Sequence, residues 1–324
     1  MREFFFAIAR ILSLLTVPYF RLQLPGWRRL AGRVGLPIRF NAMWANAGPR
    51  TIRLKPHGYR VTLDMRDWSE RLAYFLGRHY DSSMAELIEL VARPGDTFID
   101  VGANAGMILL AAARVVGSSG RMHAFEPNPG MAARLRKLIR ENGLGNATVH
   151  ECGLSEEAAE QPLTVYAGSS GWSTFGDATS QHGGAPSRPV RAKLCRADDV
   201  LPGVVAEPLI VKIDVEGYET NVVRGMKETM ARMRPLLITE IEPALLQAAH
   251  SSAAQLFSTL EVAGYLCFQR VSSVGEGGPV RLSPVRSASD IQQKDVVWCH
   301  PHSALKERID AAVDPRAAGS HGNS

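Results

Sequence analysis

The chain has 324 residues and a mass of 35.3 kDa, enough for one catalytic domain with appendages and a full hydrophobic core. Its net charge is +5, but residues 1–60 contain eleven Arg and Lys residues against the single acid Glu3, so the remainder is net acidic and we expect no nucleic-acid partner. The four cysteines are far apart and form no metal-binding or CxxC spacing, which excludes a disulfide scaffold and indicates a cytoplasmic protein with buried thiols.

Residues 1–50 are predicted to form a basic, apolar helical segment. Phe4 to Phe20 is apolar apart from Arg10, Ser13 and Thr16, but it is shorter than the ~20 residues that span a bilayer. Arg10 and the lack of a cleavage site argue against a signal peptide. Two alternatives remain. The segment lies on an anionic membrane, as a peripheral protein at the inner face of the plasma membrane, or it packs on the chain's own core or a second subunit. The oligomeric state is left open.

Residues 51–93 are predicted to form a hairpin and a helical lid. Ile52 to Met65 alternates around His57-Gly58, which favours a β-hairpin. Trp68 to Val91 has apolar residues at helical spacing.

The stretch Thr97 to Gly106 has the pattern of a ligand-binding turn between a strand and a helix. A short apolar run ends in Asp100 and Val101, glycines follow, and an apolar helix begins near Met107. Gly102 and Gly106 allow close approach of a ligand, and free N–H groups at the helix start favour a carboxylate. A second strand, starting at Arg121, ends in Glu126, where an acid can accept hydrogen bonds from both hydroxyls of a ribose.

The glycine spacing separates two cofactor classes. A dinucleotide fingerprint needs Gly-x-Gly-x-x-Gly, but counting from Gly102 the third position is Asn104 and the sixth is Met107. A nicotinamide-dependent oxidoreductase is therefore the weaker alternative. Asp100, the glycine loop and Glu126 together resemble the S-adenosylmethionine site of class I methyltransferases.

Three stretches narrow this resemblance to one family within the class I methyltransferases. They are Arg93 to Gly106, Ala124-Phe125-Glu126-Pro127-Asn128-Pro129, and Val211-Lys212-Ile213-Asp214-Val215-Glu216-Gly217-Tyr218-Glu219. In this order they resemble the signatures of the FkbM family of methyltransferases, over roughly residues 60 to 300. The resemblance implies an α/β, Rossmann-like, doubly wound and mostly parallel seven-stranded sheet, with the catalytic domain at 94–305 and a disordered tail at 306–324. It implies S-adenosyl-L-methionine as cofactor, bound by Asp100, Gly102, Ala103, Asn104, Gly106, Glu126, Pro127, Asn128, Gly153, Leu154 and Tyr80.

The alternation of strands and helices places several acids at one edge of the expected sheet. In an open parallel sheet, ligands bind beyond the carboxyl ends of the strands, where Asp100, Glu126, Asp214 and Glu240 would all lie. A loop expected between strands, Gly168 to Arg188, is too long to lack structure unless it is functional or disordered. Its centre offers Trp172 and Ser173 as substrate contacts, the alternative being a solvated loop whose Trp172 packs on the lid.

A missing motif and the acidic residues near the expected fourth strand indicate which kind of atom accepts the methyl group. Amine-modifying methyltransferases often carry Pro-Pro-Tyr after the fourth strand, and this sequence contains none, so O-methylation fits better. Asp214 and Glu216 are the candidate base and substrate ligand, with Lys212 as charge partner and Glu240 as an alternative base. Asp214 could instead only cap the next helix. No histidine lies close in sequence, so we expect no metal, although Asp214, Glu240 and a third carboxylate could hold a divalent ion.

The predicted function is an S-adenosylmethionine-dependent O-methyltransferase (EC 2.1.1.-) acting on a hydroxyl of a sugar, glycolipid or other small metabolite. An interfacial N-terminal segment would favour a lipid-linked acceptor. The non-enzymatic alternative is a cofactor-binding scaffold of a biosynthetic complex.

Overall fold

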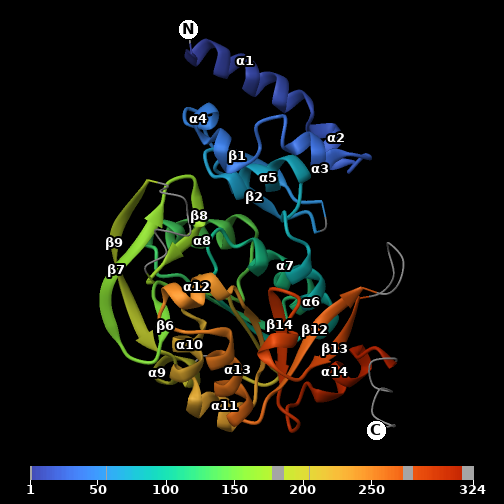
Figure 1. Cartoon of the computed structure of the whole chain (residues 1–324), viewed down its shortest axis with the longest axis vertical. Coiled ribbons are helices and arrows are strands. Elements are labelled where there is room, and N and C mark those ends of the chain that lie inside the picture. The colour runs from blue at the N-terminus through green and yellow to red at the C-terminus, as the bar shows by residue number, and fades with distance from the viewer. Residues whose placement is uncertain (1, 56, 177–185, 204, 273–279, 316–324) are drawn as a thin grey trace.

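The computed structural model describes residues 2–55, 57–176, 186–203, 205–272 and 280–315. It is built around an eight-stranded sheet with the order β13-β12-β14-β11-β10-β3-β4-β5 (Figure 1). The pairs among β11, β10, β3, β4 and β5 are parallel, whereas β11 with β14, β14 with β12, and β12 with β13 are antiparallel. The strands are β3 (Thr97–Val101), β4 (Arg121–Phe125), β5 (Ala147–His150), β10 (Leu209–Ile213), β11 (Leu236–Glu240), β12 (Leu266–Ser272), β13 (Val280–Val285) and β14 (Asp295–Cys299).

Helices cover both faces of this sheet, which confirms the predicted α/β, doubly wound class. One face packs on α6 (Ser83–Val91), α7 (Met107–Val116), α8 (Pro129–Glu141) and α14 (Lys306–Ala312). The other packs on α10 (Glu219–Gly225), α11 (Lys227–Met233) and α13 (Ala253–Val262). Because both faces are covered, β3 and β10 are buried at every position, as expected for central parallel strands. The eighth strand is β13, which extends the predicted seven through a hairpin with β12.

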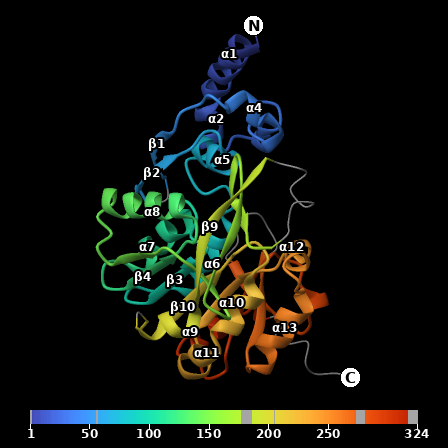
Figure 2. The same ribbon diagram turned by 90° about the vertical axis from the view of Figure 1, so that its left-hand side faces the viewer.

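A second sheet of four strands, in the order β6-β9-β7-β8, stands beside the first (Figure 2). Its strands are β6 (Gly153–Ser155), β7 (Ala159–Tyr166), β8 (Ser169–Thr174) and β9 (Ser187–Arg196). Strand β8 falls inside the stretch that we expected to be a loop, and this expectation was wrong for residues 169–174. Residues 177–185 of that stretch lie outside the described residues.

The N-terminal part forms a separate layer at one end of the molecule (Figure 1). It contains α1 (Arg2–Leu15), α2 (Val17–Arg21), α3 (Trp27–Ala31), α4 (Asn41–Trp44), the predicted hairpin of β1 (Arg50–Arg53) and β2 (Arg60–Leu63), and α5 (Trp68–Leu76). Its own apolar cluster includes Phe20, Trp44 and Phe75. Among the helices that the structure describes, none has both the length and the hydrophobicity to cross a bilayer.

Two helical predictions need correction. The expected helical segment from Trp68 to Val91 is divided into α5 and α6, because Gly77 ends α5 with a φ of 69°. The expected disordered tail begins with a helix, α14, whose Ile309 is fully buried and whose Arg308 donates to Asp96 at 2.5 and 3.0 Å. The last nine residues of the tail, 316–324, lie outside the described residues.

Candidate active site

The turn between β3 and α7 is built as the sequence predicts. Gly102 has a φ of 76°, and a Cβ there would lie 2.1 Å from the backbone oxygen of Asp214. Gly106 has a φ of 79° and packs against Leu138, where a Cβ would lie 2.5 Å from the Cδ2 atom. Helix α7 begins directly afterwards, so its first N–H groups face the carboxyl edge of the sheet.

Glu126, directly after β4, closes one side of this turn. Its carboxylate accepts the backbone N–H groups of Asn104 and Asn128, each at 2.8 Å. Burial raises the pKa of Glu126 to about 7 despite these two bonds. Asn128 in turn caps α8 by accepting the N–H of Gly130 at 3.0 Å, so the helix start and the acid are fixed together.

A small cavity joins six of the residues predicted to bind the cofactor with residues of the β10–α10 turn. It measures about 50 Å³, smaller than a nucleoside, and the rings of Phe175 and Tyr218, 5.5 Å apart, form part of its wall. The predicted residues that line it are Gly102, Asn104, Glu126, Pro127, Gly153 and Leu154, together with Ser173, Asp214 and Glu216.

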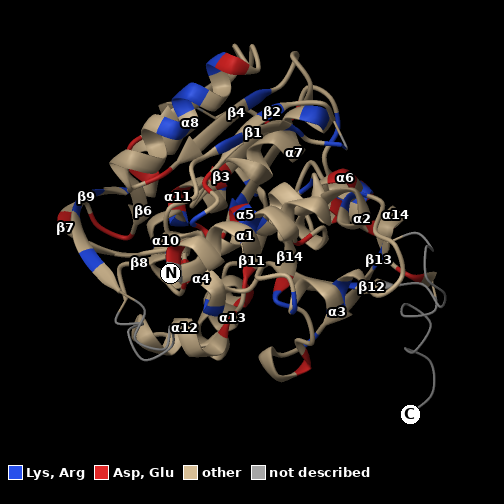
Figure 3. Cartoon of the chain, turned by 90° about the horizontal axis from the view of Figure 1, so that it is seen from above, with Lys and Arg blue, Asp and Glu red and all other residues tan. Residues whose placement is uncertain are grey.

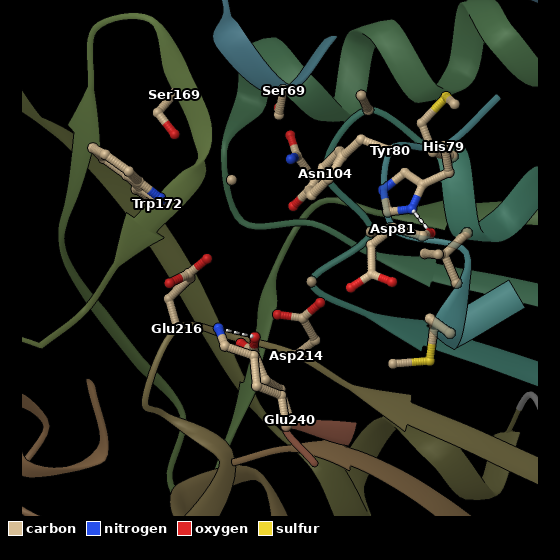
Figure 4. A pocket seen from close by; sticks show the side chains of 18 of the residues that line it. Ser69, His79, Tyr80, Asp81, Asn104, Ser169, Trp172, Asp214, Glu216 and Glu240 are labelled. Atoms are coloured by element: carbon tan, nitrogen blue, oxygen red, sulfur yellow. Dashed lines mark hydrogen bonds and ion pairs between the residues drawn. The ribbon is translucent and has the colours of Figure 1, made fainter. Parts of the chain in front are cut away.

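A larger cavity of about 600 Å³ adjoins the small one at Gly102, Asn104, Gly171, Asp214 and Glu216. Figure 4 shows Asp214 between Glu216 and Glu240 on one side and the Tyr80–Asp81 corner on the other. Trp172 and Tyr80 both line this cavity, as does Ala103. Trp172 also lies near Trp68 of the lid, with ring centroids 6.4 Å apart, so the expected packing on the lid is present and the substrate contact stays a prediction.

Three predicted cofactor residues line neither cavity. Asp100 is fully buried and forms an ion pair with Lys212 at 2.9 Å, so we place it behind the turn as a support. Gly106 and Asn128 act through the backbone contacts described above.

Lys212 holds the two neighbouring turns together. Its Nζ donates to the backbone oxygen of Gly102 at 3.0 Å and lies 3.5 Å from Asp214. Burial lowers the pKa of Lys212, but Asp100 and Asp214 outweigh this and raise it above its ordinary value. Lys212 is therefore a fixed positive charge beneath the site.

Three carboxylates meet at the carboxyl edge. Oxygens of Asp214, Glu216 and Glu240 all lie within 4.8 Å of one another, a group that could hold a divalent cation. Burial, together with Asp214 and Glu240, raises the pKa of Glu216 well above its usual range. Burial and Asp214 raise that of Glu240 to about 8. Lys294 supplies counter-charge at 3.2 Å from Glu240 and 3.1 Å from Glu242.

Backbone strain coincides with this site. Asn104 and Glu216 adopt positive φ values of 46° and 54°. Such conformations cost energy in residues other than glycine and often mark functional turns. The turn that carries Glu216 is held by Glu219, which accepts the N–H groups of Val215 and Gly217 at 3.0 and 3.2 Å.

Sequence reasoning missed two site residues. His79 lines the large cavity, and its Nδ1 lies 2.5 Å from the backbone oxygen of Asp81. Because a carbonyl can only accept, Nδ1 carries the proton and Nε2 remains an acceptor, while burial lowers the pKa of the ring. Asp295 starts β14 directly opposite Glu240. An antiparallel strand begins where its parallel neighbour ends, and this rule could have located Asp295.

The residues fit S-adenosylmethionine. Glu126 is placed for a ribose diol, and the helix start suits the carboxylate of the amino-acid end. Within the described parts of the chain, Asn104 Oδ1 and Ser170 Oγ are buried without a hydrogen-bonding partner, and both residues line the small cavity. Polar atoms left in this condition at a cavity wall are partners for a polar ligand.

The strand order, the glycine turn and the acid after the second strand define a class I S-adenosylmethionine-dependent methyltransferase. Residues 100–267, about half of the chain, match the Methyltransferase FkbM domain. The chain therefore belongs to the FkbM family of methyltransferases.

Two curated relatives are similar over part of their length. The 31-O-demethyl-FK506 methyltransferase FkbM of Streptomyces tacrolimicus is 35% identical over 138 residues, which cover 41% of this chain and 48% of that protein. Methyltransferase 1 of Beauveria bassiana is 30% identical over 166 residues, covering 46% of this chain and 66% of that protein. Among solved structures, the methyltransferase FkbM of Methylobacillus flagellatus has 16% identity and a TM-score of 0.40, covering 76% of this chain and 56% of its own.

Proposed function

We propose that this chain transfers the methyl group of S-adenosylmethionine to a hydroxyl oxygen of a sugar, glycolipid or other small metabolite. The observation that carries the proposal is the group of three carboxylates beside the cofactor turn. When bound, the cofactor supplies an electrophilic methyl group that needs an aligned nucleophile. The hydroxyl oxygen forms the new bond to carbon, the bond to sulfur breaks, and the hydroxyl proton passes to a carboxylate of the chain.

Asp214 is the proposed base. It lines both cavities, so it lies where the cofactor site meets the acceptor site. Glu240, whose pKa is raised to about 8, is better suited to donate a hydrogen bond to a neighbouring acceptor oxygen, and the pKa of Glu216 is shifted in the same direction by burial and by Asp214. Lys212 beneath Asp214 fixes its position.

The charges of the large cavity favour a neutral acceptor. Both of its lysines are already paired, Lys212 with Asp100 and Lys294 with two glutamates. The acids that line it are Glu70, Asp81, Asp214, Glu216, Glu240, Glu242 and Asp295. A phosphate or carboxylate near the reacting hydroxyl would be repelled, whereas a polyol would find acceptors for its hydroxyl hydrogens. Trp172 offers an apolar face on which a sugar ring can stack.

The S. tacrolimicus relative supports an oxygen acceptor, since its name specifies a 31-O-demethyl compound. If the N-terminal segment binds a membrane, as we propose in the next subsection from separate observations, a lipid-linked acceptor would be favoured.

The test is transfer of labelled methyl groups to lipid, polysaccharide and small-molecule fractions of a cell extract. Wild-type protein should label at least one fraction, and the label should survive mild alkali because methyl ethers resist hydrolysis and methyl esters do not. Asp214→Asn should give no label above background. Stoichiometric cofactor binding without label in any fraction would contradict the proposal and favour the scaffold alternative, and alkali-labile label would point to a carboxyl acceptor.

A further inference from the structure

Helix α1 packs one apolar side on the N-terminal cluster and exposes a second apolar side to solvent. Six apolar side chains on one side of it are 40–72% exposed: Phe4, Phe5, Ile8, Ile11, Leu12 and Leu15. At about 100° per residue these positions fall within an arc of roughly 120°. None of these six side chains is among those that pack on the N-terminal apolar cluster, as far as the described residues show.

Two polar residues of α1, Arg10 and Ser13, bond to the body of the protein. Ser13 donates to the backbone oxygen of Val34 at 2.7 Å, and Arg10 donates to that of Met43 at 2.9 Å. These contacts, together with the packing of Phe6 and Leu14 on the N-terminal apolar cluster, fix the helix to the body of the protein. The exposed arc is therefore held outward by the fold itself, at the end of the molecule seen in Figure 1.

Three exposed arginines lie in the same N-terminal layer as this apolar arc. Arg28, Arg29 and Arg33 are exposed on and after α3, in the same N-terminal layer (Figure 3 views the molecule from this end). In the described part of the chain, none of the three forms an ion pair. Leu22, between α2 and α3, is a further apolar side chain of this layer, with 69% of its area exposed.

We propose that this face, formed by the α1 arc, Leu22 and the three arginines, docks the protein on an anionic lipid surface. The apolar arc would enter the boundary between headgroups and acyl chains, and the guanidinium groups would bind lipid phosphates. Charge argues against a second copy as the occupant, because two segments with eleven basic residues and one acid each would repel. Docking on a surface also agrees with the absence, among the described helices, of one that could span it.

The test is co-sedimentation of the full chain with phosphatidylcholine vesicles, with and without phosphatidylglycerol. Wild-type protein should pellet with the anionic vesicles and only weakly with the neutral ones, and 0.5 M salt should release it. The double substitution Ile11→Asp and Leu12→Asp should reduce partitioning at least about tenfold. Replacing Arg28, Arg29 and Arg33 by Gln should reduce it by about fivefold per residue.

Val262→Asp is the matched control, because Val262 is 86% exposed on α13, remote in the fold from α1. It should pellet as the wild type does. Thermal unfolding of each variant checks that the chain is folded. Wild-type protein that stays in the supernatant, or equal pelleting of the Ile11/Leu12 variant, would overturn the proposal. So would a dimer in light scattering that the same variant dissociates, because the arc would then cover a second copy. The assay reads no methyl transfer, so its outcome is independent of the proposed activity.

Discussion

Replacing Glu126 by Gln should weaken cofactor binding by a predictable amount. The carboxylate accepts two backbone N–H groups, from Asn104 and Asn128, and still has lone pairs for two ribose hydroxyls. The side-chain amide of glutamine keeps one accepting oxygen, but an NH₂ group replaces the other. Because an NH₂ group cannot accept a hydrogen bond, one of these donors loses its partner. Losing one hydrogen bond to a charged group costs about 1.5–3 kcal/mol, so the dissociation constant should rise about 10- to 150-fold.

Calorimetric titration with S-adenosylhomocysteine at pH 8 measures this change, and Glu157→Gln at an exposed position is the matched control. Because the pKa of Glu126 is about 7 in the free chain, wild-type affinity should also fall by up to about tenfold per pH unit below 7. The Gln variant should lack this dependence. Wild-type affinity in the variant, with the same pH profile, would show that Glu126 does not hold the ribose.

Three further predictions concern the acids. Asp214→Asn should lower kcat by about 10²- to 10⁴-fold and leave the cofactor dissociation constant within about twofold; retained turnover would remove Asp214 from the proton transfer. The free chain should become more stable as the pH falls from about 8 to about 6.5. In this window Glu240, whose pKa is raised to about 8, binds a proton in the folded state but not in the unfolded one, and the raised pKa of Glu216 acts in the same direction; at lower pH, His79 and His150 with lowered pKa values oppose the trend. Scanning fluorimetry measures this stability, and a melting temperature that falls over that range would refute the reasoning. Finally, turnover should change by less than about twofold in EDTA, because Lys212 and Lys294 already balance part of the carboxylate charge; a loss restored by Mg²⁺ would assign the three carboxylates to a metal instead.

The central sheet and its acid-bearing edge could be predicted because their signals are local. Each parallel strand is a short apolar run, and the acids follow directly in the chain. Parallel topology then brings Asp214 and Glu240 together without any knowledge of side-chain packing. The same reasoning located Glu126 beside Asn104.

Pairings between distant segments could not be predicted in this way. Strand β8 has a Ser- and Gly-rich sequence, and its extended form depends on pairing with β7 and on the bond from Trp68 Nε1 to Ser169 Oγ at 3.0 Å. The buried ion pair of Asp100 with Lys212 depends on the β3–β10 register, which the sequence does not show. His79 lies at a corner between two helices, and only the folded chain brings that corner over the sheet.

The close approach of Gly102 to the Asp214 carbonyl joins the glycine turn after β3 to the turn that carries Asp214, the proposed base. A side chain at residue 102 would push both turns apart, and Lys212 binds them from below. The turn after β3 and the turn after β10 are therefore held together as one rigid part. If the proposed roles are right, a change of substrate during evolution would come from β8 and the corner at Tyr80, which line the large cavity, and not from these two turns.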